Sequence, residues 1–323
     1  MFQEQFTMDD GVSLFLRRWE APRSEFKSPK AILHIIHGMG EHSERYGELS
    51  VRLGKEGIDV WALDQRGHGQ STQLGNPHGS GGLLGHCSDG DGVSRVAEDI
   101  HIINNEIKKR HPGIPVFLMG HSWGSFIAQM YIEKFEGKSK WKDGLDLAGC
   151  ILSGTRGPGG LKIFLAAKLM RFMAFIIGQR KGSELARNMT SGSYNKPFRP
   201  NRTEFDWLSR DEKEVDSYIA DPFCGFLCSI GFYRDMTGAL NKIHKKREMR
   251  KIRRELPIYI FSGTSDPVTD MGVSHASLEA VYKHLEIRDL ETVLYKDARH
   301  ETLNETNKEE VMDKLISWLL LHI

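Results

Sequence analysis

The serine in the sequence Gly120-His121-Ser122-Trp123-Gly124 constrains the fold more than any other feature, because both flanks suit a G-x-S-x-G motif. Residues 115–119 (PVFLM) read as a short buried strand, and residues 125–135 (SFIAQMYIEKF) carry apolar side chains at helical spacing. A strand, a serine on a tight turn and a helix form a nucleophile elbow, which presents the hydroxyl at the edge of a parallel sheet. The two glycines permit close packing where a Cβ would intrude. This context predicts that Ser122 is a nucleophile.

A serine nucleophile needs a general base and an acid that orients the base, and the C-terminal part of the chain offers both. Residues 256–263 read as a strand that ends just before Asp266, and residues 291–295 read as another strand that ends just before His300. Loops that follow parallel strands meet at the carboxyl edge of the sheet, where ligands bind. Asp270 and Asp297 compete for the acid's role, but Asp266 follows its strand most closely. We therefore expect Ser122, His300 and Asp266 to act as nucleophile, base and acid.

Two backbone N–H groups are candidates for an oxyanion hole. In folds built around this elbow, one donor is the residue after the nucleophile, and the other lies on the loop after the third strand. The first position is Trp123. Residues 30–36 (KAILHII) read as a core strand that ends in His37-Gly38-Met39-Gly40-Glu41-His42, so Met39 is the expected second donor. An ordinary glycine-rich turn is the alternative for this loop.

Strands and helices alternate on both sides of a single interruption. An antiparallel pair (2–8 and 12–19) precedes strand 31–36, helix 45–54, strand 60–63, helix 93–110 and, beyond the elbow, strand 150–153. This alternation predicts an α/β fold with a mostly parallel central sheet and helices on both faces. The pattern breaks at Gly154 and resumes at Pro257. We expect a core formed by residues 1–155 and 236–323, with an inserted helical cap at 156–235.

Segments 37–46 (HGMGEHSERY), 64–71 (DQRGHGQS) and 120–124 resemble those of the monoacylglycerol lipase and lysophospholipase branch of the α/β-hydrolase superfamily. Segments 205–215 and 218–222 resemble the cap of those enzymes. The chain departs from the family in the glycine-rich segment 75–92 and in the bulky Trp123. The resemblance implies that Glu41 and Arg45 contact the polar glycerol end of a substrate. Helix capping and surface ion pairing remain the alternative for both residues.

Residues 161–177 (LKIFLAAKLMRFMAFII) form a strongly apolar helix candidate within the cap. Lys168 and Arg171 interrupt it, so it is too short and too charged to span a bilayer. Three interpretations stay open for this segment: a core helix, the wall of an acyl pocket, and a face that docks on a membrane surface.

Composition excludes several classes of function. The net charge of +1, from 44 basic and 43 acidic residues, favours neither nucleic acid nor other polyanions. Cys224 and Cys228 lie four residues apart without companion histidines, so the pattern predicts no metal site. The N-terminus shows no signal-peptide pattern, so we expect a cytoplasmic protein, with peripheral membrane contact through the cap left open.

These patterns predict a serine hydrolase without cofactor or metal that cleaves the ester of a small amphipathic lipid, either a monoacylglycerol or a lysophospholipid. A small-ester carboxylesterase and an aminopeptidase on the same scaffold are the alternatives. The aminopeptidase would hold its substrate's amine with cap acids such as Asp206, Asp211, Glu212 and Glu214. A ligand receptor that borrowed the fold would not need all three catalytic residues.

Overall fold

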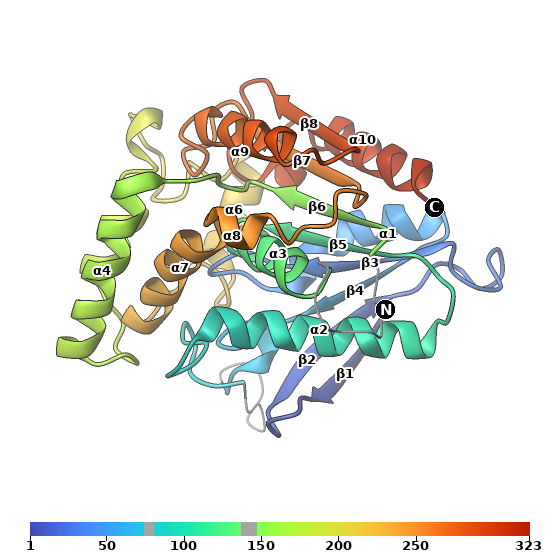
Figure 1. The fold of residues 1–323 in the computed structure, drawn as a ribbon, viewed down its shortest axis with the longest axis horizontal. Helices are drawn as coiled ribbons and strands as arrows, with labels where there is room; N and C mark the ends of the chain where they lie inside the picture. The colour runs from blue at the N-terminus through green and yellow to red at the C-terminus, as the bar shows by residue number, and fades with distance from the viewer. Residues whose placement is uncertain (74–80, 137–146) are drawn as a thin grey trace.

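A single sheet organises the computed structural model, which describes residues 1–73, 81–136 and 147–323. Its strand order is β1-β2-β4-β3-β5-β6-β7-β8 (Figure 1). The strands are β1 (Phe2–Thr7), β2 (Ser13–Trp19), β3 (Ala31–Ile36), β4 (Ile58–Leu63), β5 (Val116–His121), β6 (Gly149–Ser153), β7 (Ile258–Gly263) and β8 (Leu290–Tyr295). The pairs β1–β2 and β2–β4 are antiparallel, and all the other pairs are parallel. The predicted α/β class and the early antiparallel pair are confirmed.

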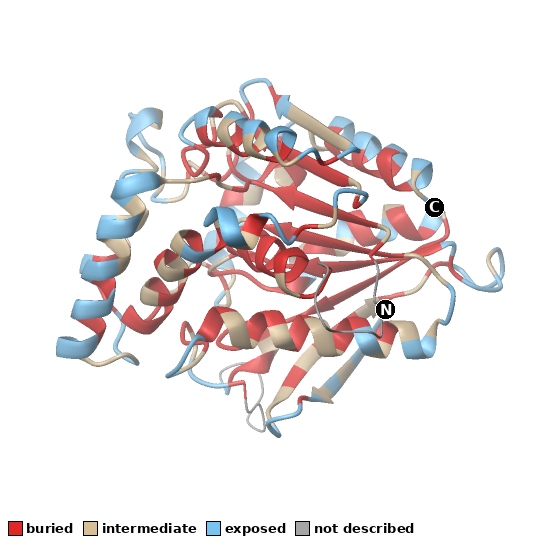
Figure 2. Cartoon of the chain, in the orientation of Figure 1, coloured by how far each residue is buried: buried red, intermediate tan, exposed pale blue. Residues whose placement is uncertain are grey.

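Helices cover both faces of the sheet, which explains why its central strands are apolar at every position. Along β3, Ile32 and Ile36 enter one hydrophobic core, while Leu33 and Ile35 enter the other. The first core lies under α2 (Gly92–Arg110), α3 (Trp123–Lys134) and α9 (Val273–His284), and the second lies under α1 (Gly47–Lys55) and α10 (Lys308–Leu321). Figure 2 shows the central strands as buried throughout. Because strand side chains alternate between faces, a strand that is buried on both sides reads as a continuous apolar run.

The interruption in the pattern, residues 154–257, is an insertion between β6 and β7, and it is helical. It contains α4 (Gly160–Ile177), α5 (Glu184–Thr190), α6 (Glu212–Ala220), α7 (Ile230–Ile243) and α8 (Lys246–Met249), with the short 3-10 helix η3 (Lys196–Phe198). In Figure 1, α4 and α7 lie beyond the carboxyl ends of the strands. The boundary predicted at 235/236 falls inside α7, which crosses it without a break.

Three further 3-10 helices, η1 (Ser43–Tyr46), η2 (Gly69–Ser71) and η4 (Thr302–Asn304), complete the elements among the described residues. Part of the glycine-rich segment 75–92 lies outside the described residues. None of the helices among the described residues is long and apolar enough to cross a membrane.

Candidate active site

Ser122 lies at the sharp turn between β5 and α3. Its φ of 51° and ψ of −119° are strained for a residue with a side chain. Its N–H donates to the carbonyl of Ser153 on β6 at 2.9 Å, which fixes the turn against the sheet. A Cβ at Gly120 would lie 2.3 Å from the Gly124 carbonyl oxygen, and one at Gly124 would lie 2.1 Å from the carbonyl oxygen of Ile36. Both glycines are therefore needed for the close approach of α3 to the sheet.

Asp266 and His300 meet at the carboxyl edge of the sheet. Asp266 follows β7 and His300 follows β8, and Nδ1 of His300 lies 3.0 Å from each carboxylate oxygen of Asp266. Both side chains are buried. The Val268 N–H also donates to Asp266 at 2.8 Å and fixes the carboxylate. Because parallel strands bring their ends together, two residues that are 34 positions apart become partners.

The electrostatic environment of His300 favours its protonated form. Burial acts to lower the pKa of His300, but the negative charge and the hydrogen bond of Asp266 outweigh burial and raise the pKa above 6.5. The site therefore stabilises the imidazolium form of His300, which is the form that a general base adopts after it accepts a proton.

The two competing acids lie elsewhere. Asp270 forms an ion pair with Arg156 at 2.6 Å and is half exposed. Asp297 is exposed, and its N–H donates to Thr264. Of the three carboxylates, Asp266 is the one that contacts His300.

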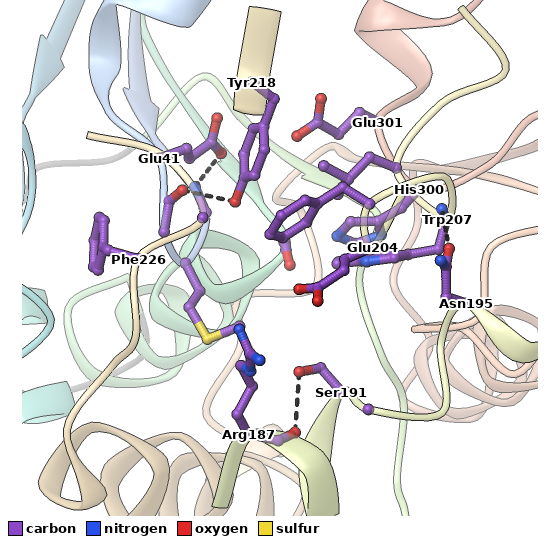
Figure 3. Close-up of a pocket in the computed structure, with 18 of the residues that line it drawn as sticks. Glu41, Arg187, Ser191, Asn195, Glu204, Trp207, Tyr218, Phe226, His300 and Glu301 are labelled. Carbon is purple, nitrogen blue, oxygen red and sulfur yellow. Dashed lines mark hydrogen bonds between the residues drawn. The ribbon is translucent and has the colours of Figure 1, made fainter. Parts of the chain in front are cut away.

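Ser122 and His300 line the same cavity, whose volume is about 340 Å³. The core also contributes Met39, Glu41 and His121 to its wall. Figure 3 shows Glu41, Tyr218 and Phe226 on one side of this cavity, with His300 and Trp207 on the other, and Arg187 and Ser191 farther along it. The predicted nucleophile and the predicted base therefore share one cavity.

The loop formed by residues 37–42, which we call the oxyanion loop, runs beside the nucleophile. A Cβ at Gly38 would lie 3.3 Å from Cβ of Ser122, so the main chain just before Met39 packs against the serine. Met39 lines the cavity. Trp123 is the first residue of α3, and the first N–H groups of a helix have no partner inside the helix. The two backbone positions expected to hold an oxyanion thus both lie close to Ser122.

The indole of Trp123 points away from the cavity. It is 1% exposed, and its Nε1–H donates to Oε1 of Gln65 at 3.0 Å. The Trp123 side chain is absent from the residues that line the cavity. The bulky residue beside the nucleophile therefore does not reduce the space for a substrate.

Glu41 and Arg45, expected to contact the substrate, are bound mainly to other parts of the protein. Glu41 accepts a hydrogen bond from the Gly38 N–H at 2.5 Å, and Arg45 donates to it at 2.9 Å. Arg45 also binds Glu301 and lies over the ring of Tyr218. Glu41 lines the main cavity, whereas Arg45 lines a smaller adjoining one. This geometry favours the alternative of ion pairing, here between a partly buried cation and buried carboxylates.

Sequence reasoning did not single out Glu301 or Tyr218. Glu301 is buried directly after His300, and burial opposes its charge, but Arg45 outweighs this effect and lowers the pKa of Glu301. The Tyr218 hydroxyl donates to the carbonyl of Gly40 at 2.8 Å, so the insertion supports the oxyanion loop. Position next to the predicted base was the only sequence signal for Glu301.

His121 packs beside the base, with 4.9 Å between its ring centroid and that of His300. Its Nδ1 is 3.1 Å from the Ser153 hydroxyl, and burial, followed by the nearby charge of His300, lowers the pKa of His121 to about 4. His121 is therefore a neutral side chain that packs against His300. His68 is buried, with its Nδ1 3.0 Å from the Arg66 carbonyl, and lies outside the cavity wall.

The insertion closes over His300 through main-chain contacts. The Glu301 N–H donates to the Leu208 carbonyl at 2.8 Å, and the ring of Trp207 lies 5.1 Å from that of His300. Arg299 donates to the carbonyl oxygens of Asp206 and Ser209. These bonds hold segment 205–215, which resembles the cap of the family, against His300.

No residue of α4 lines the cavity within the described parts of the chain. Met170, Met173 and Ala174 are buried, while Phe172 is 62% exposed and Phe175 is 85% exposed. The interpretation of this helix as a wall of the acyl pocket is therefore not supported. Much of its apolar surface faces outward instead.

Comparisons with known proteins agree with this geometry. Residues 27–307 match the family described as "Serine aminopeptidase, S33". The monoacylglycerol lipase of Mycolicibacterium smegmatis is 25% identical over 91% of this chain and 90% of its own length. The monoglyceride lipase of Mus musculus is 27% identical over 96% of this chain and 88% of its own length.

Among solved structures, a thermostable carboxyl esterase from Bacillus coagulans has a TM-score of 0.85 at 24% identity, covering 98% of this chain and 97% of the esterase. A soluble variant of the Saccharomyces cerevisiae monoglyceride lipase, in complex with a substrate analogue, has a TM-score of 0.72 at 21% identity, covering 99% of this chain and 94% of the lipase. At this level of identity, the two structures establish the fold.

Proposed function

The chain belongs to the serine aminopeptidase S33 family of α/β-hydrolases, and from this membership we propose that it is a serine hydrolase that cleaves the carboxylic ester of monoacyl lipids. The observation that carries the proposal is the arrangement of three side chains. Ser122 and His300 line one cavity, and Asp266 lies 3.0 Å from Nδ1 of His300. The relatives described as monoacylglycerol and monoglyceride lipases support this substrate class.

In the acylation step, Nε2 of His300 takes the proton from the Ser122 hydroxyl while Oγ attacks the ester carbonyl. The new C–O bond converts the carbonyl oxygen into an oxyanion. The N–H groups of Met39 and Trp123 bind this oxyanion, and each is worth about 3 kcal/mol if it behaves like a measured oxyanion-hole donor. The Trp123 N–H acts at the N-terminus of α3, where the helix dipole also favours negative charge.

The tetrahedral intermediate then collapses. His300 returns the proton to the departing alcohol oxygen, the C–O bond to glycerol breaks, and the acyl group stays on Ser122. Water attacks this acyl-enzyme with His300 again as base, and the fatty acid leaves. Asp266 keeps the imidazole in one tautomer and stabilises the imidazolium throughout. Each step uses groups of the chain, the ester and water.

The cavity wall suits an amphipathic substrate. Met39, Leu208, Phe226 and Tyr233 provide apolar surface, while the residues contributed by α5 and η3 are largely polar. Burying an acyl chain against the apolar part supplies about 0.8 kcal/mol for each methylene. A cavity of about 340 Å³ accepts one acyl chain more readily than two, which supports monoacyl over diacyl lipids.

The aminopeptidase alternative retains one observation in its favour. Asp206, Asp211, Glu212 and Glu214 do not line the cavity, whereas Glu204 of the insertion does. A carboxylate there offers a partner for a substrate amine. The three candidate functions therefore differ in the substrate that reaches the same nucleophile.

A substrate panel distinguishes the candidates. The purified protein is assayed on p-nitrophenyl esters from acetyl to decanoyl, on a monoacylglycerol, a lysophospholipid and a diacylglycerol of equal chain length, and on an aminoacyl amide. We expect kcat/KM to climb by up to about fourfold for each added methylene before it levels off, with little turnover of the diacyl lipid or the amide.

Ser122→Ala serves as the inactive control for the panel and should also lose labelling by a fluorophosphonate probe. Activity that is highest on acetyl esters would favour the small-ester enzyme, and activity that is highest on the amide would favour the aminopeptidase. Probe labelling that persists in Ser122→Ala would remove the nucleophile assignment.

We further propose that the insertion acts as a cap and docks on a lipid surface through α4. The outward face of this helix combines Phe172, Phe175 and Ile176 with the cations Lys168 and Arg171, and residues 160–177 contain no acid. Aromatic and aliphatic residues favour the interfacial region of a bilayer, while lysine and arginine attract anionic headgroups. Such a position would bring the cavity close to a source of monoacyl lipid.

A further inference from the structure

A second group of reactive side chains lies outside the cavity that contains Ser122. Nε2 of His42, at the end of the oxyanion loop, is 2.8 Å from Oδ2 of Asp221 in the loop between α6 and α7. The thiol of Cys224 completes the group, because the ligand atoms of all three residues lie within 4.8 Å of one another. From this juxtaposition we propose that His42, Asp221 and Cys224 form a zinc site that joins the oxyanion loop to the insertion.

The donor set selects the metal. An imidazole nitrogen, a carboxylate oxygen and a thiolate sulfur are ligands that Zn²⁺ accepts in tetrahedral geometry, whereas Mg²⁺ and Ca²⁺ prefer oxygen ligands. Ligand atoms of a tetrahedral zinc site lie about 3–4 Å apart, given zinc–ligand bonds of about 2.0–2.3 Å. The three side chains therefore need only a small adjustment. Three protein ligands leave the fourth position to water.

The surroundings of the group fit this role. His42 and Cys224 are buried, and Asp221 is half-buried beside a surface hollow of about 470 Å³ that gives an ion access. The other carboxylate oxygen of Asp221 accepts from the Phe223 N–H at 2.8 Å, which leaves Oδ2 directed at His42. Such outer contacts orient metal ligands.

The local charges also permit a cation. Arg17 borders the hollow, but its guanidinium binds Asp64 and Glu44. Arg45 acts on Cys224 electrostatically, but its charge is balanced by Glu41 and Glu301. Burial raises the pKa of the Cys224 thiol, and a bound zinc ion would supply the positive charge that a thiolate requires.

A metal in this position would act on the cavity through the oxyanion loop. The loop between α6 and α7 already binds this segment, because the Gly225 N–H donates to the Gly40 carbonyl at 3.0 Å. Phe226, the next residue, lines the cavity. Zinc would thus tie the insertion to the loop that carries Met39 and restrict adjustment of the cavity wall to a substrate, so we expect it to inhibit turnover. This inhibition rests on the proposed hydrolase function, whereas metal binding does not.

Zinc binding is measured by calorimetry with ZnCl₂ on the full chain and on the inactive Ser122→Ala variant, which separates binding from activity. We expect one equivalent to bind both proteins and to raise their Tm. Cys224→Ser and Asp221→Asn should each weaken binding at least about tenfold. Cys228→Ser, which changes another buried cysteine four residues away, should bind zinc as the parent protein does.

Cobalt provides a spectroscopic readout of the thiolate ligand. Co²⁺ bound to the parent protein should show a near-ultraviolet sulfur-to-metal charge-transfer band, which is absent in Cys224→Ser and present in Cys228→Ser. Absence of binding to the parent protein, or equal binding by Cys224→Ser, would overturn the site. Zinc binding with no loss of ester turnover would overturn the inhibitory role. Failure of the proposed esterase activity would leave the metal-binding test unaffected, because binding is measured without turnover.

Discussion

The guanidinium of Arg45 donates to both carboxylate oxygens of Glu301, at 2.6 Å each, and thereby joins the helical turn after the oxyanion loop to the residue that follows His300. Glu41 receives a third hydrogen bond from the same guanidinium. Two loops that are far apart in sequence, one carrying Met39 and one carrying His300, are thus held by a single cation whose side chain is 12% exposed.

Removing this cation should cost stability as well as activity. Arg45→Ala leaves two buried carboxylates without their partner, and breaking a buried ion pair in this way costs about 3–5 kcal/mol. We expect a clear fall in Tm and a lower kcat with little change in KM, measured by calorimetry and steady-state kinetics on one soluble ester. Full stability combined with a raised KM would instead show that Arg45 binds the substrate.

Arg52→Ala is the matched control for Arg45. Arg52 forms ion pairs with Glu309 and Asp313, but both acids are exposed. Exposed pairs contribute about 0–1 kcal/mol, so this variant should stay close to the parent in both stability and kcat.

Asp266→Asn should fold normally and lose about 10⁴-fold in kcat. An amide cannot favour the tautomer that Nδ1 of His300 needs, and the loss is estimated from the equivalent change in a serine protease. Asp270→Asn and Asp297→Asn should keep most of the activity, because neither carboxylate contacts His300. An inactive Asp297→Asn variant together with an active Asp266→Asn variant would show that the acid is Asp297 and not Asp266.

The pH profile should report the raised pKa of His300. A general base works in its neutral form, so kcat/KM falls as pH decreases through the pKa of His300 in the free enzyme. Burial acts to lower this pKa, but Asp266 outweighs burial and raises it above 6.5, so the midpoint of the acidic limb should lie above pH 6.5. The profile is recorded on a soluble ester with a substituted phenol as leaving group. A midpoint well below 6.5 would mean that burial dominates.

The exposed face of α4 should govern attachment to lipid but not the chemistry. Replacing Phe172 and Phe175 with Glu should reduce cosedimentation with anionic vesicles and slow turnover of a monoacylglycerol presented in them. Turnover of a short water-soluble ester should stay within about twofold of the parent, since α4 does not line the cavity.

Val51→Glu is the control for the α4 variant, because Val51 is 59% exposed on α1, outside the insertion. It should bind vesicles as the parent does. Equal binding by all three proteins would rule out the docking surface on α4. Raising the salt concentration should weaken parent binding if Lys168 and Arg171 contribute through charge.

Local patterns were sufficient to predict most elements of the core. Continuous apolar runs such as residues 31–36 become central strands because helices cover both of their faces. The elbow around Ser122 could also be predicted, because its glycines are required by close backbone contacts at a turn that a short sequence motif defines. The interpretation of α4 as a pocket wall was not supported, because helical spacing shows that a helix is apolar but not which partner covers each side.

The sequence by itself determined the α/β class, the chain order of the predicted nucleophile, acid and base, and a charge balance that does not favour nucleic acid. These properties depend on local composition, periodicity and spacing. Tertiary structure decided which side chains meet: Asp266 rather than Asp297 at His300, Glu301 at Arg45, and His42 beside Cys224. Each of these pairings joins segments that meet only when the sheet and its insertion fold. Contact depends on distance in space and not on separation along the chain.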